Sequence, residues 1–197
     1  MSDEEFLEIE DLTENTRKKA KAKGKPKGKR GELKIVEILN KRFFDILDKN
    51  KDWGQFSRSI GSGNRWGQKV VLSKSAKETF TGDLTTPTNF KFVVEIKTGY
   101  NDIDLNSMFD NGHKEIDKFI KQVTDDSGRC ERKPLLIWTK DRKPPIAFIL
   151  KKDFPKVDFE YYISYNEWHV LSLDNLLKQK DDFFFSIKEK HDFHRRV

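Results

Sequence analysis

A chain of 197 residues is long enough for one domain with its own hydrophobic core, and we expect one domain and not two. Charged residues make up 37% of it, and the formal net charge of +6 at pH 7 points to polyanionic partners such as nucleic acid. The sequence shows no apolar run of membrane-spanning length and no signal peptide, so we expect a cytoplasmic protein without membrane contacts. One cysteine cannot form a disulfide within the chain, and four scattered histidines argue against a zinc site.

The first thirty residues divide into two halves of opposite charge. Residues 1–15 carry seven acidic side chains and no basic one, whereas residues 16–30 carry nine basic side chains and no acidic one. Such a segment buries too little apolar surface to offset its conformational entropy, so we predict a disordered arm over residues 1–30. The basic half suits contact with DNA phosphates, with a solubilising tail as the alternative. The candidate DNA contacts are Lys23, Lys25, Lys27, Lys29 and Arg30.

An amphipathic helix is predicted from Gly31 to about Asp48, because apolar residues recur there at spacings of three and four. Glu32 lies in the first turn, where an acidic side chain complements the helix dipole. Glu37 is the competing acidic candidate on this helix, and it projects ~140° away from Glu32.

A glycine-rich segment follows a short predicted strand over residues 55–60. It reads GSGNRWG over residues 61–67, and the glycines on either side of Ser62 permit unusual backbone angles and close approach to a phosphate. An ordinary Gly/Ser connector is the alternative. Trp66 either stacks on a splayed base or closes the core. The basic stretch that follows, which includes Lys69, is expected to form a small hairpin.

The segment FKFVVEIKT over residues 90–98 has the β-branched and aromatic content of a strand. Alternation along a strand puts Glu95 and Lys97 on one face and Val94 and Ile96 on the other. If residues 81–84 return as a neighbouring strand, Asp83 comes to lie beside Glu95. Two carboxylates and an ammonium group would then converge, which suits Mg²⁺ binding and activation of a water molecule. A surface ion pair is the alternative.

The elements after this strand are recognised by helical spacing or by short apolar runs between turn residues. They are, in chain order, a helix over residues 113–124, strands over 135–139 and 146–150 with a turn at 141–145, a hairpin over 161–171, and a helix that starts at Ser172. Residues 181–197 form an aromatic and basic extension. Its block Phe183-Phe184-Phe185 either packs on the core or forms a dimer contact.

Asp83, Glu95 and Lys97 together resemble the D…ExK signature of the PD-(D/E)xK nuclease superfamily, with Gly82 in place of the family's proline. The segment from Arg58 to Gly63 is similar to the Arg-x-x-x-Ser-Gly loop of archaeal-type Holliday-junction resolvases. The resemblance covers roughly residues 31–150. It implies an α/β fold of the restriction-endonuclease-like type, with a central mixed β-sheet flanked by helices and a nuclease domain over residues 31–180.

The resemblance also implies roles for individual side chains. Asp83, Glu95 and Glu32 would bind Mg²⁺, for which Mn²⁺ would substitute, and Lys97 would position the attacking water. Ser62 would stand at the position of the family's active-site serine. Gln122 resembles a glutamine that some relatives place near the metal-bound water, although we expect it to be a solvated helix residue. The implied DNA contacts outside the arm are Arg58, Ser62, Asn64, Arg65, Trp66 and Lys69.

The resemblance therefore implies a Mg²⁺-dependent endonuclease that resolves four-way DNA junctions during recombination or repair and takes no small-molecule substrate. Resolvases of this type act as dimers, so the resemblance also implies a homodimer and favours the block Phe183-Phe184-Phe185 as the dimer contact. Its abundance of Lys, Asn and Phe suits an AT-rich phage or bacterial genome. An endonuclease of the same superfamily that acts on linear duplex or DNA ends is one alternative. A catalytically idle DNA-binding module is another, but DNA binding alone gains nothing from carboxylates that face phosphate.

Overall fold

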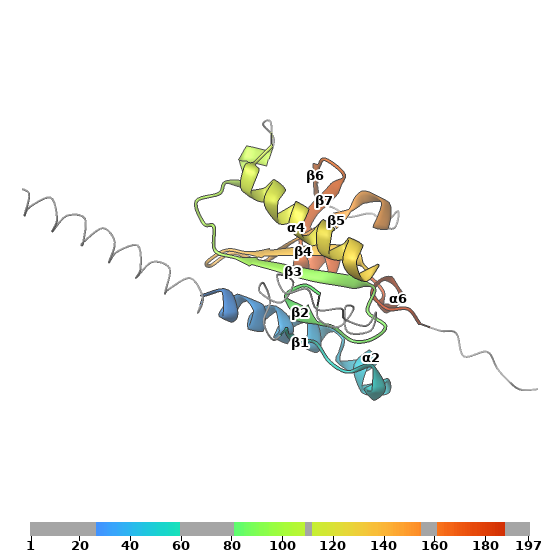
Figure 1. The fold of residues 1–197 in the computed structure, drawn as a ribbon. Helices are drawn as coiled ribbons and strands as arrows, with labels where there is room; N and C mark the ends of the chain where they lie inside the picture. The colour runs from blue at the N-terminus through green and yellow to red at the C-terminus, as the bar shows by residue number, and fades with distance from the viewer. Residues whose placement is uncertain (1–26, 60–80, 109–111, 155–160, 188–197) are drawn as a thin grey trace, which may run out of the picture.

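The computed structural model describes residues 27–59, 81–108, 112–154 and 161–187. A helix spans residues 27–42 and is followed by α2 (Phe44–Lys49) and the short 3₁₀ helix η1 (Lys51–Trp53). Two short strands, β1 (Ser57–Arg58) and β2 (Leu84–Thr85), then pair in antiparallel orientation. These elements lie below the main sheet in Figure 1.

The central sheet has five strands in the order β3-β4-β5-β7-β6. Their bounds are β3 (Phe92–Thr98), β4 (Lys133–Thr139), β5 (Ile146–Leu150), β6 (Ile163–Tyr165) and β7 (Trp168–Ser172). Strands β3 and β4 are parallel and the other neighbours are antiparallel. A parallel pair needs a long crossover connection, and α4 (Lys114–Cys130) provides it, after the 3₁₀ helix η2 (Leu105–Met108).

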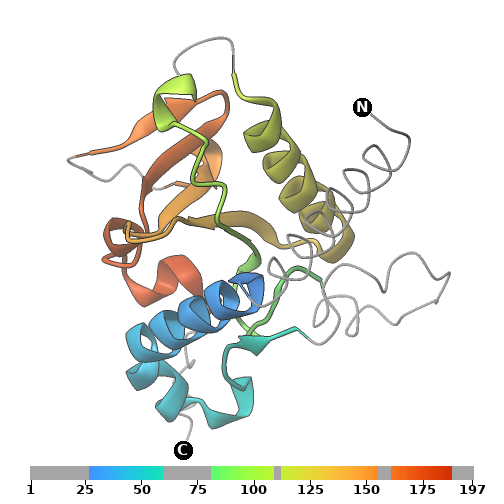
Figure 2. The ribbon, with the colours of Figure 1, turned by 90° about the vertical axis from the view of Figure 1, so that its left-hand side faces the viewer.

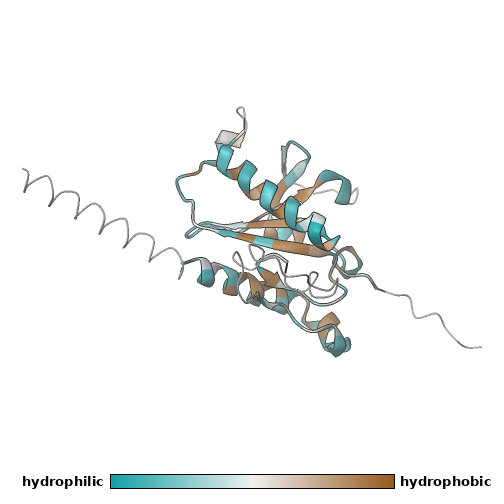
Figure 3. Cartoon of the chain, in the orientation of Figure 1, coloured by the Kyte–Doolittle hydropathy of each residue, from teal (hydrophilic) through white to brown (hydrophobic). Residues whose placement is uncertain are grey.

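Alternation along the strands divides the core into two clusters, one on each face of the sheet. Val94 and Ile96 of β3 pack with Ile35 and Leu39 of the helix over residues 27–42. On the opposite face, Leu136 of β4 packs beneath α4. The resulting order of helix, sheet and helix is visible from two sides in Figures 1 and 2. Figure 3 shows hydrophilic and hydrophobic residues interspersed along α4, and its residues Ile116, Phe119 and Val123 are buried. The expected α/β fold with a mixed, helix-flanked sheet is confirmed.

The helix that precedes the sheet begins earlier than the sequence predicts. Residue 27, where the described part of the chain begins, is already helical, so Lys27, Lys29 and Arg30 belong to the helix and not to a disordered arm. Gly31 packs directly on the end of β3, where a Cβ atom would lie 1.9 Å from Thr98 Oγ1. Lys27 forms an ion pair with Asp141 at 2.7 Å, after β4. These tertiary contacts stabilise a helical turn whose composition alone favours no regular structure.

The aromatic block near the C-terminus packs in the core, which corrects the expectation that it forms a dimer contact. After η3 (Lys151–Asp153), the chain forms β6 and β7, then α5 (Leu173–Leu176), which Ser172 caps as predicted, and α6 (Asp181–Phe184). Phe184 and Phe185 are 1% and 0% exposed. Their rings lie 4.9 and 5.0 Å from the ring of Phe43, centroid to centroid. The block completes the core because the underside of the sheet offers more apolar surface than the first helix covers.

Candidate active site

Glu95 and Lys97 lie on the face of β3 that packs against α4. Glu95 is in register with Leu136 of β4, a core residue of that layer, and only 2% of Glu95 is exposed. Lys97 Nζ donates a hydrogen bond to Glu95 Oε1 at 2.6 Å and lies 5.4 Å from the centre of the Phe119 ring. The predicted carboxylate and ammonium pair is thus buried beneath a helix and is not a surface ion pair.

Asp83 is attached to the same strand through backbone hydrogen bonds. Its N–H donates to the carbonyl of Val94 at 2.9 Å, and its Oδ2 accepts from the N–H of Ile96 at 2.8 Å. Gly82 precedes it with φ of 81°, and a Cβ atom at this position would lie 2.6 Å from the Val94 carbonyl oxygen. The ring of a proline fixes φ near ~−65°. The glycine found in place of the family's proline is therefore required by the backbone that positions Asp83.

Gln122 of α4 completes the cluster: it is exposed to solvent, as expected, but its side chain also contacts the two charged residues of β3. Its Nε2 donates to Glu95 Oε1 at 2.5 Å, and its Oε1 accepts from Lys97 Nζ at 2.7 Å. Asp126, one turn further along the same face of α4, is buried and paired with Arg129 at 2.9 Å. The sequence analysis did not identify Asp126, although its spacing of four from Gln122 was a usable signal.

The surroundings of the cluster raise the pKa values of its two carboxylates, Asp83 and Glu95. Burial is the main factor that raises the pKa of Glu95, and the neighbouring charge of Asp83 raises it further, while Lys97 opposes the change. Burial also raises the pKa of Asp83, against the hydrogen bond from Ile96, and the charge of Glu32 adds to the increase. Glu95 is buried and Asp83 is half-buried, and the two carboxylates resist joint ionisation, so a nearby cation is needed if both are to be charged at neutral pH.

Glu32 and Arg58 lie at the edge of this cluster. The side chain of Arg58 forms a hydrogen-bonded ion pair with Glu32, of which 13% is exposed. Glu32 thus approaches Asp83 closely enough to act on its pKa, but its carboxylate is engaged by the guanidinium group. Glu37 lies on the exposed side of the helix. Of the two acidic candidates on this helix, Glu32 is the one that faces the site.

Many of the predicted DNA contacts cannot be related to this cluster. Lys29 and Arg30 are exposed on the first helix. The remaining candidates lie outside the described residues: Ser62, Asn64, Arg65, Trp66, Lys69, Lys23 and Lys25.

The donor set of this cluster fits a hard divalent cation. Asp83 and Glu95 supply carboxylate oxygens, which Mg²⁺ and Mn²⁺ prefer. Within the described ranges, no three His, Cys, Asp or Glu side chains converge closely enough to hold an ion by themselves. Mg²⁺ is commonly held by one or two carboxylates and completes its coordination with water and substrate phosphate. The two carboxylates therefore match Mg²⁺ better than a metal that demands a full set of protein ligands.

Comparison with known proteins places this chain in a family. The model of the family described as "Phage putative PDDEXK endonuclease" matches residues 23–192, which include Asp83, Glu95 and Lys97. The chain belongs to this phage PDDEXK endonuclease family. No curated protein and no solved structure shows a significant match to it.

Membership of the phage PDDEXK endonuclease family confirms the PD-(D/E)xK resemblance and supports an endonuclease of phage type. Four segments that are distant in sequence contribute to the cluster, namely the first helix, the turn before β2, β3 and α4. In the part of the chain that the structure describes, no helix has both the length and the apolar content needed to cross a membrane.

Proposed function

We propose that this PDDEXK endonuclease hydrolyses phosphodiester bonds of branched DNA, in particular at four-way junctions, in a Mg²⁺-dependent reaction. The observation that supports the hydrolytic part is the hydrogen-bonded contact of Lys97 with the buried Glu95 and with Gln122, beside Asp83. A protein that needs only positive surface charge to bind DNA gains nothing from a buried carboxylate, Glu95, beside a half-buried one, Asp83. An idle DNA-binding module is therefore the less favoured function.

Each side chain has a distinct task in this proposal. Asp83 and Glu95 would hold the divalent cation, and Glu32 adds negative charge at the edge of the site. The bound cation supplies Lewis acidity at the scissile phosphate and lowers the pKa of a water molecule. Lys97 is held by two acceptors, so its ammonium group has a fixed direction from which to orient the attacking water. Gln122 fixes both Glu95 and Lys97.

Support for a branched substrate comes from the segment around Arg58. The resemblance to a resolvase loop begins at Arg58, and its guanidinium group is held beside the site by Glu32. An arginine there suits the phosphate backbone on either side of the cut. A homodimer with two-fold symmetry would present two such sites to two strands of a junction, which is itself roughly two-fold symmetric.

The deciding experiment compares a synthetic four-way junction with a linear duplex of the same sequence. With Mg²⁺ or Mn²⁺ we expect paired, symmetric incisions close to the crossover and little cutting of the linear duplex, and with a chelator we expect no cutting. Equal cutting of both substrates, or incision of a single strand by a monomer, would contradict the junction preference and favour an endonuclease for linear DNA. Binding without any cutting in Mg²⁺ would favour the idle module.

A further inference from the structure

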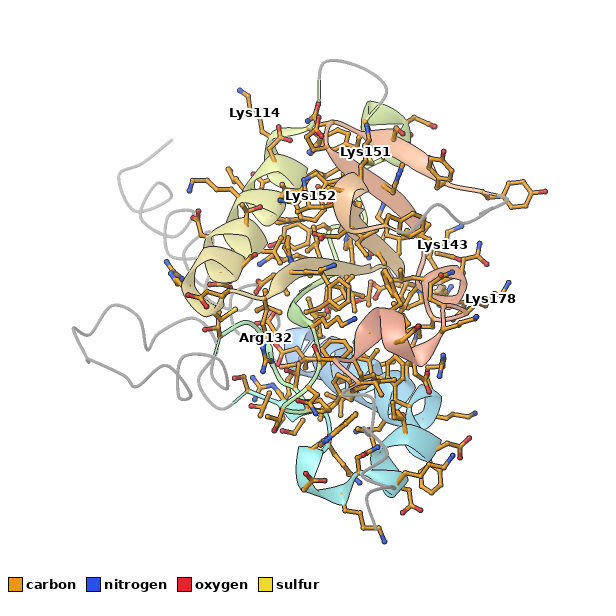
Figure 4. All side chains as sticks on the ribbon, turned by 90° about the vertical axis from the view of Figure 1, so that its right-hand side faces the viewer. Lys114, Arg132, Lys143, Lys151, Lys152 and Lys178 are labelled. Atoms are coloured by element: carbon orange, nitrogen blue, oxygen red, sulfur yellow. The ribbon has the colours of Figure 1, made fainter. Side chains whose placement is uncertain are left out.

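A lysine-rich hollow lies at the end of β3 and β4 opposite to Lys97, and the proposed reaction does not use it. It has a volume of about 700 Å³ and lies between η3, the N-terminal ends of β3 and β4, and the segment that joins α5 to α6. Five lysines line it: Lys91, Lys133, Lys152, Lys178 and Lys180. Figure 4 shows Lys152 and Lys178 on one face of the molecule, where Lys143 and Lys151 also lie. We call this feature the basic hollow.

The charges of the basic hollow are only partly compensated. Two aspartates, Asp153 and Asp182, also line it, so five lysines and two aspartates leave a formal charge of +3. Lys133 is paired with Asp153 at 3.1 Å, and Lys91 donates to the backbone carbonyl of Asp182 at 2.5 Å.

The other three lysines, Lys152, Lys178 and Lys180, are exposed. Among the described residues none of them has a carboxylate within ion-pair distance, and Lys178 contacts the neutral side chain of Asn175 at 3.0 Å. Three ammonium groups thus remain available to an anion.

The framework of the basic hollow is rigid, because it is part of the sheet. The N–H of Lys91 donates to the carbonyl of Phe184 at 2.8 Å, and the N–H of Lys133 donates to the carbonyl of Lys91 at 2.9 Å. The partly buried ring of Phe183 forms part of the wall and packs on Phe92. Like charges from separate segments are therefore brought together by the fold itself. Their mutual repulsion is unfavourable unless an anion offsets it.

The distance from the active site limits what such an anion can be. Lys91 and Lys97 are six residues apart along β3, which corresponds to ~20 Å at ~3.3 Å per residue. A phosphate bound in the basic hollow is thus not the one that is cut. In a duplex, ~20 Å corresponds to about six nucleotide steps of ~3.4 Å along one strand.

We propose that the basic hollow binds the phosphate backbone of a DNA arm at about six nucleotides from the incision. The inference rests on the proposed function for its DNA substrate, but not on a preference for junctions. DNA is favoured over an acidic protein segment because the hollow presents at least three separate ammonium groups over an open surface, which matches a row of phosphates. It would give the endonuclease a second grip on DNA that is independent of base sequence.

The test is a triple variant of the full-length chain, Lys152→Gln, Lys178→Gln and Lys180→Gln. A matched control, Lys41→Gln, Lys49→Gln and Lys51→Gln, removes the same charge from exposed lysines on and near α2. Binding to a linear duplex of about three helical turns is measured in a chelator, so that no cleavage occurs, over a range of salt concentrations. We expect the hollow variant to bind at least about tenfold more weakly. The slope of log K against log salt should fall by up to ~2.7, at ~0.9 for each lost phosphate contact.

Further measurements separate this effect from loss of folding and from the junction proposal. Arginine at the same three positions should restore both the affinity and the slope, because it keeps the charge. On a four-way junction whose incision sites have been mapped with Mg²⁺, ethylation of phosphates about six nucleotides from the incision should interfere with binding of the wild-type chain and not of the hollow variant. Unchanged affinity and slope in the hollow variant, or equal losses in the control variant, would overturn the proposal. Equal cutting of junction and duplex would contradict the proposed substrate and leave this binding result unaffected.

Discussion

The surroundings of Glu95 indicate a chemical role for this residue. Its carboxylate is buried, accepts hydrogen bonds from Lys97 and Gln122, and has a raised pKa because of burial and the neighbouring Asp83. A carboxylate in such a place lowers the stability of the folded chain when it ionises. Retaining it there is consistent with a role in binding a cation.

We expect Glu95→Gln to abolish cleavage and to leave DNA binding unchanged or tighter. The amide keeps the shape of the side chain but removes a metal ligand and a negative charge that repels phosphate, so the cleavage rate should fall by several orders of magnitude. Cleavage assays and gel shifts on one preparation measure both effects. Glu167→Gln, the same change at an exposed position of the β6–β7 hairpin, is the control. Full activity of Glu95→Gln would remove Glu95 from the site.

We expect Gly82→Ala to destabilise the fold and to displace Asp83. The positive φ of 81° disfavours a side chain, and the added Cβ would lie 2.6 Å from a carbonyl oxygen of β3, which cannot move without disturbing the sheet. The free energy of unfolding should fall by about 1–3 kcal/mol, as is typical of strained backbone positions. Gly128→Ala, in α4 with no atom within 4 Å of the new Cβ, should instead stabilise the chain by about 0.5–1 kcal/mol. Chemical denaturation measures both, and equal effects would contradict this account.

At the scale of elements, α4 extends beyond the end that the sequence predicts. The helix was expected to end at residue 124 but continues to Cys130. Residues 125–128 read DDSG, which have low helix propensity. Asp126 and Cys130 are nevertheless buried against the sheet. Tertiary burial outweighs the weak local preference, and it extends the helix as far as the crossover to β4 requires.

We expect Phe185→Ala to lower the free energy of unfolding by about 3–5 kcal/mol, the range for a large core aromatic residue. Phe185 is fully buried and stacks on Trp53 with the ring centres 5.6 Å apart. Ile187→Ala, at a residue that is 49% exposed, is the control and should change stability little. Denaturation and gel filtration are measured together. A shift from dimer to monomer with unchanged stability would restore the interpretation of this block as an interface.

At the scale of the whole molecule, charge is distributed over three regions: the arm before the first helix, the buried active site and the basic hollow. The arm joins the described part of the chain at residue 27, where Lys27 is held to Asp141 near the C-terminal end of β4. The basic hollow lies at the other end of β3 and β4. DNA contacts from both regions would therefore flank the site.

We expect deletion of residues 1–26 to weaken binding to DNA of every shape by a similar factor and to leave the preference for junctions unchanged. The deleted segment contains six basic residues. If half of them contact phosphates, the slope of log K against log salt should fall by ~2.7. Deletion of residues 1–15 alone, which carry the seven acidic side chains, is the control and should not weaken binding. An unchanged slope for the longer deletion would identify the arm as a solubilising tail.

The sequence by itself determined what depends on local pattern. The alternation in residues 90–98 predicted that Glu95 and Lys97 share a face, the short apolar runs predicted β4 and β5, and Ser172 predicted the start of α5. These features follow from the period of a strand and from the capping chemistry of a helix, which neighbours in sequence fix. The order of Asp83, Glu95 and Lys97 was likewise enough to identify the superfamily.

Only the tertiary structure decided which distant residues meet. Gln122 looks like a solvated glutamine in its own helix, and it reaches Glu95 only because α4 crosses over β3. The sequence allowed the aromatic block near the C-terminus either to pack on the core or to form a dimer contact, and the packing of the sheet decided for the core. The basic hollow joins lysines from separate segments that no sequence window contains. The physical reason is the same in each case. Burial and long-range charge interactions depend on how the layers pack, and the local preferences of the sequence do not specify that packing.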